Sequence, residues 1–205
     1  MSRYLGPKVR RMRALETYLS GLSGKSMEQR SQKPGQHGHR THRRKLSDFG
    51  VQLKEKQKVQ FNYGLREKQL KRLAREARRS TTAAGEKLAE LLERRLDNVV
   101  FRAGFARSIP AARQLVAHGH IEVNGRRVNI PSYRVDVGDV LGPREKSRNL
   151  ETVREAITSV RLTRPEWLEC NYAEGYAKVL SLPGVESMSV AVDIIRVIEY
   201  YAKRG

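Results

Sequence analysis

The chain has little cysteine, no long apolar run and few acidic side chains for its many basic ones. Cys170 is the single cysteine, so no intramolecular disulfide can form and an oxidising compartment gains no support. No apolar stretch approaches the roughly 20 residues of a membrane-spanning helix, which excludes an integral membrane protein. The N-terminal segment lacks the apolar core of a secretory signal. We therefore expect a soluble protein of a reducing, cytosol-like compartment.

Basic residues are what the chain has in excess. Its 41 Lys and Arg against 22 Asp and Glu give a formal net charge of +19 over 205 residues. A protein this basic repels itself, and binding a polyanion that releases counterions relieves the repulsion. The basic residues are spread along the chain rather than collected on one amphipathic helix, which disfavours a membrane surface as the partner. The composition predicts a nucleic-acid partner, most simply a folded RNA.

Residues 1–46 form a basic extension that differs from the rest of the chain. Apolar residues are sparse and Gly and Pro interrupt it, so it cannot bury enough surface alone to offset its ordering entropy. A short apolar stripe at Val9, Met12 and Leu15 predicts one or two helical turns. We expect RNA contacts from Arg10, Arg11, Arg13, His37, Arg40, Arg43, Arg44 and Lys45. His37, His39 and His42 could ligate a metal, but histidines on a Gly-rich basic loop favour RNA, so we expect no metal.

Residues 47–86 have the pattern of a basic helical domain. Asn62-Tyr63-Gly64 interrupts it, and apolar residues then recur at helical spacing from Leu65 to Ala77. The stripe is thin, so we expect residues 182–205 to complete this domain. The segment from Val190 to Tyr201 is rich in β-branched and aromatic residues, which predicts a strand there.

Residues 87–181 are expected to form a second domain that begins with two helices. Thr82 is the expected N-cap of the first helix, whose apolar face runs from Leu88 to Val100. Ser108 is the expected N-cap of the second helix, and Gly119 stands where a left-handed residue ends a helix. The pattern thus predicts a helical corner.

A small antiparallel sheet should follow this corner. Asn124-Gly125 predicts a two-residue hairpin loop because both residues accept positive φ, and it places Glu122 opposite Arg127. Residues 135–141 predict a further turn and strand, and residues 150–162 a helix. The fold class is therefore α+β, with a small antiparallel sheet in the second domain.

Cationic and amide side chains crowd around this corner. The candidates are Arg107, Arg113, Gln114, His118, His120, Asn124, Arg126 and Arg127. RNA is recognised by shape, phosphate, 2′-hydroxyl and exposed bases, which needs long donors on a rigid support. The arginine fork can bind a phosphate bidentately and stack on a base. The alternatives are surface ion pairs, of Arg127 with Glu122 and of Arg94 with Glu90, and a turn-forming role for Asn124.

Several motifs also resemble a known family. They are residues 95–102 (RLDNVVFR), 112–120 (ARQLVAHGH), 123–128 (VNGRRV), 131–134 (PSYR), 3–7 (RYLGP), 34–38 (PGQHG), and 55–58 (EKQK) with 63–64 (YG). In this order they resemble the bacterial small-subunit ribosomal protein S-four family, over most of the chain. The resemblance extends the RNA-contact candidates to Arg94, Arg95, Lys56, Lys58 and Tyr63.

The resemblance implies a structural constituent of the small ribosomal subunit without a cofactor. It implies a primary binder of 16S rRNA at a five-way junction that nucleates subunit assembly. It also implies proteins three and five as neighbours, proximity to incoming mRNA, a contribution to translational accuracy, and a cytoplasmic or plastid ribosome. Many relatives bind zinc through cysteines near the N-terminus. Val9 and Met12 occupy two of those positions here, which indicates the zinc-free form.

Two alternatives use the same RNA-binding module. One is an RNA-modifying enzyme, but the remaining residues are too few and too basic for a catalytic domain. The sequence also lacks a phosphate-binding glycine loop and a nucleophile with a plausible base. The other is an extra-ribosomal RNA-binding factor, which would not be expected to carry the N-terminal motifs and the C-terminal tail together.

Overall fold

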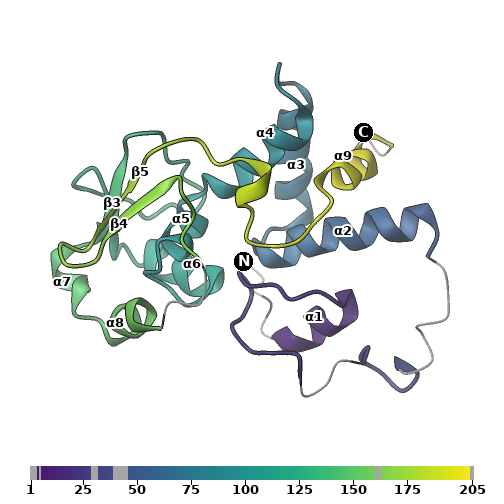
Figure 1. Cartoon of the computed structure of the whole chain (residues 1–205), viewed down its shortest axis with the longest axis horizontal. Helices are drawn as coiled ribbons and strands as arrows, with labels where there is room; N and C mark the ends of the chain where they lie inside the picture. The colour runs from purple at the N-terminus through teal and green to yellow at the C-terminus, as the bar shows by residue number, and fades with distance from the viewer. Residues whose placement is uncertain (1–3, 5, 29–31, 39–45, 160–162, 204–205) are drawn as a thin grey trace.

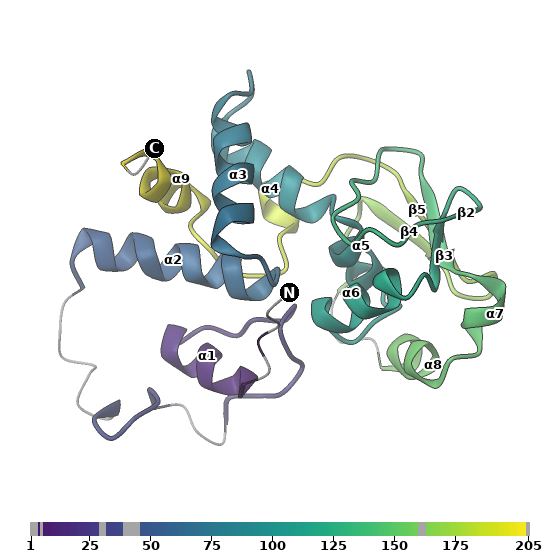
Figure 2. The same ribbon diagram turned by 180° about the vertical axis from the view of Figure 1, so that it is seen from behind.

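The computed structural model describes residues 4, 6–28, 32–38, 46–159 and 163–203. Figures 1 and 2 show two parts side by side, a helical part and a part that contains a small sheet. The helical part contains α1 (Lys8–Leu15), α2 (Asp48–Asn62), α3 (Glu67–Arg78), α4 (Ala84–Glu93) and α9 (Ile194–Ala202). The sheet-containing part is built from the residues that lie between α4 and α9 in the sequence. The predicted α+β class is confirmed.

The helices of the first part form where the apolar stripes predict them. Met12 and Leu15 are buried on α1, which confirms the short helix of the extension. Ser47 caps α2 by accepting a hydrogen bond from the Gly50 amide at 3.2 Å. Gly64 follows α2 with φ +59°, a left-handed conformation that glycine adopts without strain, so the predicted helix break is confirmed.

The C-terminal segment is a helix, so the predicted strand over residues 190–201 is wrong. Asp193 caps α9 by accepting from the Arg196 amide at 3.3 Å. Ile194, Val197 and Tyr201 are buried at helical spacing, and α9 packs against α2, α3 and α4. Burial of this face against three helices outweighs the β propensity of the individual residues.

The apolar run from Leu88 to Val100 forms two helices rather than one. Arg95 adopts extended backbone angles between α4 and α5 (Leu96–Arg102) and makes a β-bridge with Arg134. The Leu96 amide donates to the Tyr133 carbonyl at 2.8 Å, so a distant loop takes a hydrogen bond that a continuous helix would use. The predicted Thr82 cap is also wrong, because α4 begins after Ala83 without a side-chain cap.

The second part begins with a helical corner, as predicted. Ser108 caps α6 (Ile109–Ala117) by accepting from the Ala111 amide at 3.4 Å. Gly119 ends α6 with φ +74°, and α6 packs against α5. Both ends of α6 are therefore fixed, the first by the Ser108 cap and the last by the left-handed turn at Gly119.

A five-stranded antiparallel sheet follows this corner, in the order β2-β1-β3-β5-β4. The strands are β1 (Ile121–Val123), β2 (Arg126–Arg127), β3 (Val140–Pro143), β4 (Leu168–Asn171) and β5 (Tyr176–Val179). The β1–β2 hairpin pairs Glu122 with Arg127, as predicted, and both Asn124 and Gly125 have positive φ. Two short helices, α7 (Glu145–Arg148) and α8 (Glu151–Thr158), and a 3-10 turn (Val185–Ser187) complete the sheet-containing part. The predicted helix over 150–162 is confirmed through residue 158, and residues 160–162 lie outside the described chain.

Candidate nucleic-acid interface

Exposed polar donors meet where α6 ends and the β1–β2 hairpin begins. Gln114 on α6 and His118, the C-cap residue of that helix, are exposed and lie one helical turn apart. The ring centroid of His118 lies 6.1 Å from that of His120, which follows Gly119. Asn124, Arg126 and Arg127 on the hairpin are also exposed. The structure therefore brings these six sequence-predicted residues to the end of α6 and the adjoining hairpin, the region that we call the corner.

Arg127 lies against the helix end rather than pairing with Glu122. A Cβ atom added to Gly119 would lie 2.1 Å from the Arg127 Nε, so the guanidinium covers the backbone of that glycine. Arg127 and Glu122 are both in the described chain and make no ion pair there. The guanidinium is therefore held beside His118 and His120 with its charge unneutralised by the neighbouring carboxylate.

Gly119→Ala is expected to disturb the corner through two effects. The left-handed φ of +74° disfavours any side chain by about 1–2 kcal/mol, and the new methyl group would displace the Arg127 guanidinium. Urea denaturation should show a loss of about 1–2 kcal/mol in unfolding free energy. Gly125→Ala is the matched control, because Gly125 has φ +73° with no atom near its added Cβ. Weakened RNA binding should appear only with Gly119→Ala, and equal binding by both variants would contradict the placement of Arg127.

Asn124 shapes the hairpin and ties it to the sheet. Its Nδ2 donates to Asp139 Oδ1 at 2.7 Å, and its Oδ1 accepts from the Val140 amide at 2.9 Å. These bonds use the amide within the protein, which agrees with the turn-forming alternative. Asn124 thus fixes the hairpin turn against the start of β3.

Arg107 lies one residue before the N-cap of α6, at the end of that helix opposite the corner. Its Nη1 lies 3.1 Å from Glu155 Oε2 on α8, and both side chains are about half exposed. A pair this open to solvent is weakly held. A phosphate group can therefore compete with Glu155 for Arg107.

Two predicted contact residues, Arg95 and Arg113, bind a buried carboxylate within the protein. Asp97 has no exposed surface and accepts from Arg95 at 3.1 and 2.8 Å and from Arg113 Nη2 at 2.6 Å. Arg113 also donates to the Gly64 carbonyl at 2.8 Å, which joins α6 to the end of α2. Arg113 therefore links the two parts, whereas the side-chain bonds of Arg95 to Asp97 lie within the second part. Helical spacing placed Arg113 opposite the apolar face of α6, but its side chain is only partly exposed because Asp97 binds it.

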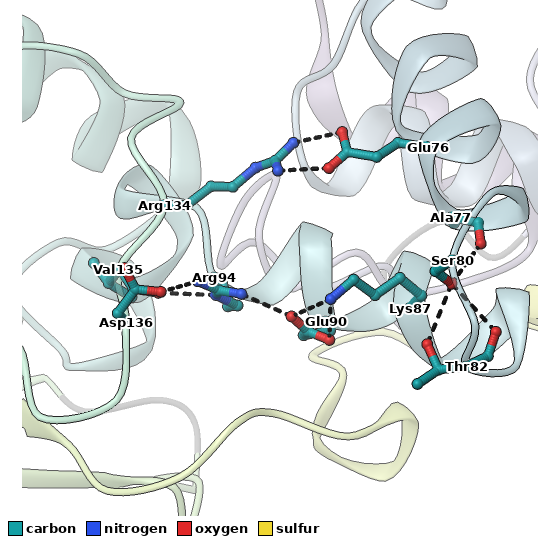
Figure 3. Close-up of polar contacts among 10 residues, drawn as sticks. All are labelled: Glu76, Ala77, Ser80, Thr82, Lys87, Glu90, Arg94, Arg134, Val135 and Asp136. Carbon is teal, nitrogen blue, oxygen red and sulfur yellow. Dashed lines mark hydrogen bonds and ion pairs between the residues drawn. The ribbon is translucent and has the colours of Figure 1, made fainter.

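Arg94 is likewise occupied within the protein. It donates to Glu90 at 2.7 Å, to the Val135 carbonyl at 2.9 Å and to Asp136 (Figure 3). The ion pair of Arg94 with Glu90 is the alternative to an RNA contact that the sequence analysis gave for Arg94. Arg94 therefore fastens the loop before β3 to the end of α4.

The candidates of α2 and its C-cap also have internal partners. Lys56 lies 2.8 Å from Glu67 and Lys58 lies 2.6 Å from Glu55. Tyr63 has no exposed surface, and its hydroxyl donates to the buried carboxylate of Glu93. Burial raises the pKa of Glu93, and burial followed by the charge of Glu93 raises the pKa of Tyr63. These three residues contribute to the fold.

The extension divides into described and undescribed candidates. Arg10 and His37 are exposed, Arg11 stacks on the rings of Tyr4 and Phe61, and Arg13 donates to the Gln32 carbonyl at 2.8 Å. Arg40, Arg43, Arg44 and Lys45 lie outside the described residues, as do His39 and His42. Within the described chain no three His, Cys, Asp or Glu side chains are close enough to hold a metal ion, and no helix could cross a membrane.

The sequence analysis missed a basic segment beside the corner. His120 Nδ1 lies 3.0 Å from Ser147 Oγ on α7, and the Arg144 amide donates to the His120 carbonyl at 2.9 Å. Lys146 and Arg148 on the same short helix are exposed. The sequence signal for this segment was the run of residues 144–148 (REKSR). It carries three basic residues and comes soon after the strand predicted over residues 135–141.

Comparison with known proteins agrees with this geometry. Residues 3–93 match the ribosomal protein S4/S9 N-terminal domain and residues 94–141 match the S4 domain. The chain is 54% identical over 204 residues to small ribosomal subunit protein uS4 of Methylobacillus flagellatus, with both chains covered completely. It belongs to the uS4 family. Small ribosomal subunit protein uS4B of Nitrosomonas europaea is 50% identical over 204 residues, with the same coverage, and uS4 of Brevibacillus brevis is 46% identical over 99% of this chain and all of its own.

Membership confirms the resemblance found in the motifs. The uS4 family consists of structural, non-enzymatic ribosomal proteins, so the enzyme alternative is excluded. The boundary between the two family matches, at residues 93 and 94, falls where α4 ends. The corner lies wholly within the matched S4 domain.

Proposed function

We propose that this chain is a structural constituent of the small ribosomal subunit that binds 16S rRNA through the corner. The observation that carries this assignment is the contrast between two groups of basic residues. Arg94, Arg95 and Arg113 are neutralised by carboxylates, whereas Arg126 and Arg127 are exposed on the hairpin. Family membership supports the ribosomal role.

The chemistry of the corner suits a folded RNA. An A-form helix has a major groove too narrow for side chains, so phosphates, 2′-hydroxyls and splayed bases are what a protein reads. Arg126 and Arg127 supply planar forks for phosphate, and Gln114 supplies both donors and an acceptor for 2′-hydroxyls or base edges. His118 and His120 offer flat rings for stacking. The fixed ends of α6 hold these groups in place before RNA arrives.

More specifically, we propose a place within the subunit. The chain is a primary binder at the five-way junction of 16S rRNA and nucleates subunit assembly. It lies beside small-subunit proteins three and five, near the channel through which mRNA enters, and contributes to translational accuracy. The motif resemblance supports this placement, and the net charge of +19 supports RNA as the partner. The bacterial relatives favour a cytoplasmic ribosome over a plastid one.

Binding to a five-way junction fragment of 16S rRNA tests the proposed function. Filter binding at several salt concentrations should give tight association and a steep negative slope of log affinity against log salt, because each phosphate contact releases counterions. A random RNA duplex of equal length is the control and should bind more weakly at every salt concentration. Equal affinity for the two RNAs would contradict specific recognition.

A further inference from the structure

A second cationic surface lies between the two parts of the molecule and is lined by none of the six corner residues. It is an open groove of about 680 Å³. Its polar lining comes from α3 (Gln69, Arg72 and Glu76), from Arg95 at the α4–α5 break, and from Ser132 and Arg134 in the loop before β3. Two apolar residues, Leu73 and Leu91, also line it. The groove therefore exists only because the loop of the second part docks on the helical part.

The charge of the groove is positive. Three arginines and one carboxylate line the groove. Asp97, which pairs with Arg95, has no exposed surface and is not among the lining residues. Within the described chain Arg72 forms no ion pair, and its side chain is exposed. Hydrogen bonding from Arg134 holds the pKa of Glu76 below its usual value, and the charges of Arg72 and Lys87 act in the same direction. Glu76 is thus a single anion among several cations.

The Arg134–Glu76 pair has the geometry of a replaceable contact. Arg134 donates two parallel hydrogen bonds to Glu76, at 2.6 and 2.7 Å (Figure 3). The two side chains are 38% and 39% exposed, so solvent screens the pair and it contributes little to stability. A phosphate presents the same two-oxygen edge to an arginine fork as a carboxylate does. Arg134 can therefore exchange Glu76 for a phosphate without leaving an unpaired charge buried.

Basic residues continue from the groove along the exposed side of α3. Lys68, Arg72 and Arg75 are exposed and follow each other at intervals of four and three residues, which places them along one side of the helix. A strand that entered the groove would meet cations at successive turns. None of these residues was among the sequence-predicted contacts.

We propose that this groove binds a phosphodiester of an RNA strand, with Arg72 and Arg134 as its donors and Glu76 as the carboxylate that the phosphate displaces. The site rests on the proposed function, because it gives the same RNA a second backbone contact. The α3 residues would guide the strand onward from the groove. The two parts of the molecule would then be joined by the bound strand as well as by protein contacts.

Glu76→Gln separates this proposal from a purely structural ion pair. Removing the displaced carboxylate should tighten binding of the junction fragment about threefold to tenfold, because the phosphate no longer competes with it. Glu169→Gln is the matched control. Glu169 is exposed on β4, at the edge of the sheet opposite the hairpin strand β2, and its substitution changes the net charge equally. Binding of Glu76→Gln no tighter than that of Glu169→Gln would overturn the site.

Arg72→Ala provides the second arm. Because Arg72 is exposed and makes no ion pair in the described chain, the variant should keep the wild-type melting temperature. Its RNA affinity should fall about threefold to tenfold, and its salt slope should become shallower by about one unit. Wild-type affinity and slope would overturn the site.

Titration with inorganic pyrophosphate distinguishes a strand from a free anion. Saturable pyrophosphate binding that Arg72→Ala abolishes, with RNA affinity unchanged, would assign the groove to a free phosphate compound and overturn the proposal. The proposed function and the groove proposal can be rejected independently of each other. If the wild-type chain does not prefer the junction fragment over duplex, the proposed function fails. If it does and the groove variants bind like the wild type, only the groove is rejected.

Discussion

Asp97→Ala is expected to lower the free energy of unfolding by about 3 kcal/mol. Asp97 has no exposed surface and is the shared carboxylate of Arg95 and Arg113. The Arg95 side chain is 7% exposed, so the variant would leave it buried without its anion. Arg113 is 30% exposed and can recover some hydration, which places the loss at the lower end of the range for broken buried pairs.

Chemical denaturation with two probes would measure this loss. Asp136→Ala is the control, because Asp136 pairs with Arg94 but its side chain is 73% exposed. That variant should lose less than about 1 kcal/mol. Equal losses in the two variants would contradict the structural role assigned to Asp97. Since Arg113 also binds the Gly64 carbonyl, Asp97→Ala should additionally loosen the contact between the two parts.

Arg126→Ala together with Arg127→Ala is expected to weaken binding of the junction fragment about 100-fold, because each arginine fork that contacts RNA contributes about 1–3 kcal/mol. Both residues are exposed on β2, so the unfolding free energy should change by less than about 0.5 kcal/mol. The salt slope should become shallower by about two units. Filter binding across a salt series would measure both changes.

The control must remove the same charge elsewhere. Arg154→Ala with Arg196→Ala does so, on α8 and on α9, where Arg154 bonds Asn149 and Arg196 pairs with Asp193. This double variant should bind within about threefold of the wild type, because charges away from the RNA act only through the screened field of the protein. A loss as large as that of the hairpin variant would mean that net charge alone determines binding.

Local signals in the sequence predicted the corner well. Ser108 as an N-cap, Gly119 as a left-handed helix end and the Asn124-Gly125 loop each depend on a few adjacent residues. The chemistry of such turns needs no knowledge of the rest of the fold. This is why the exposed group from Gln114 to Arg127 could be predicted together.

The sequence could not indicate which arginines have internal partners. Arg113 binds Asp97, 16 positions earlier, and Gly64, 49 positions earlier, and helical periodicity carries no information about either contact. The break at Arg95 depends on a loop that returns from residues 131–135. The α9 helix depends on packing against α2, α3 and α4, which outweighs the β propensity of its residues. Long-range contacts decided each of these cases.

Ultraviolet cross-linking of the chain in reconstituted small subunits, followed by mass spectrometry of the nucleotide-bearing peptides, tests the RNA-binding surface most directly. The corner predicts cross-links on the end of α6 and on the hairpin, at peptides that contain His118, His120 and residues 121–128. Peptides of α8 and β4 should carry few. Cross-links that concentrate on α8 and β4 and spare the hairpin would contradict the assignment of the corner as the rRNA-binding surface.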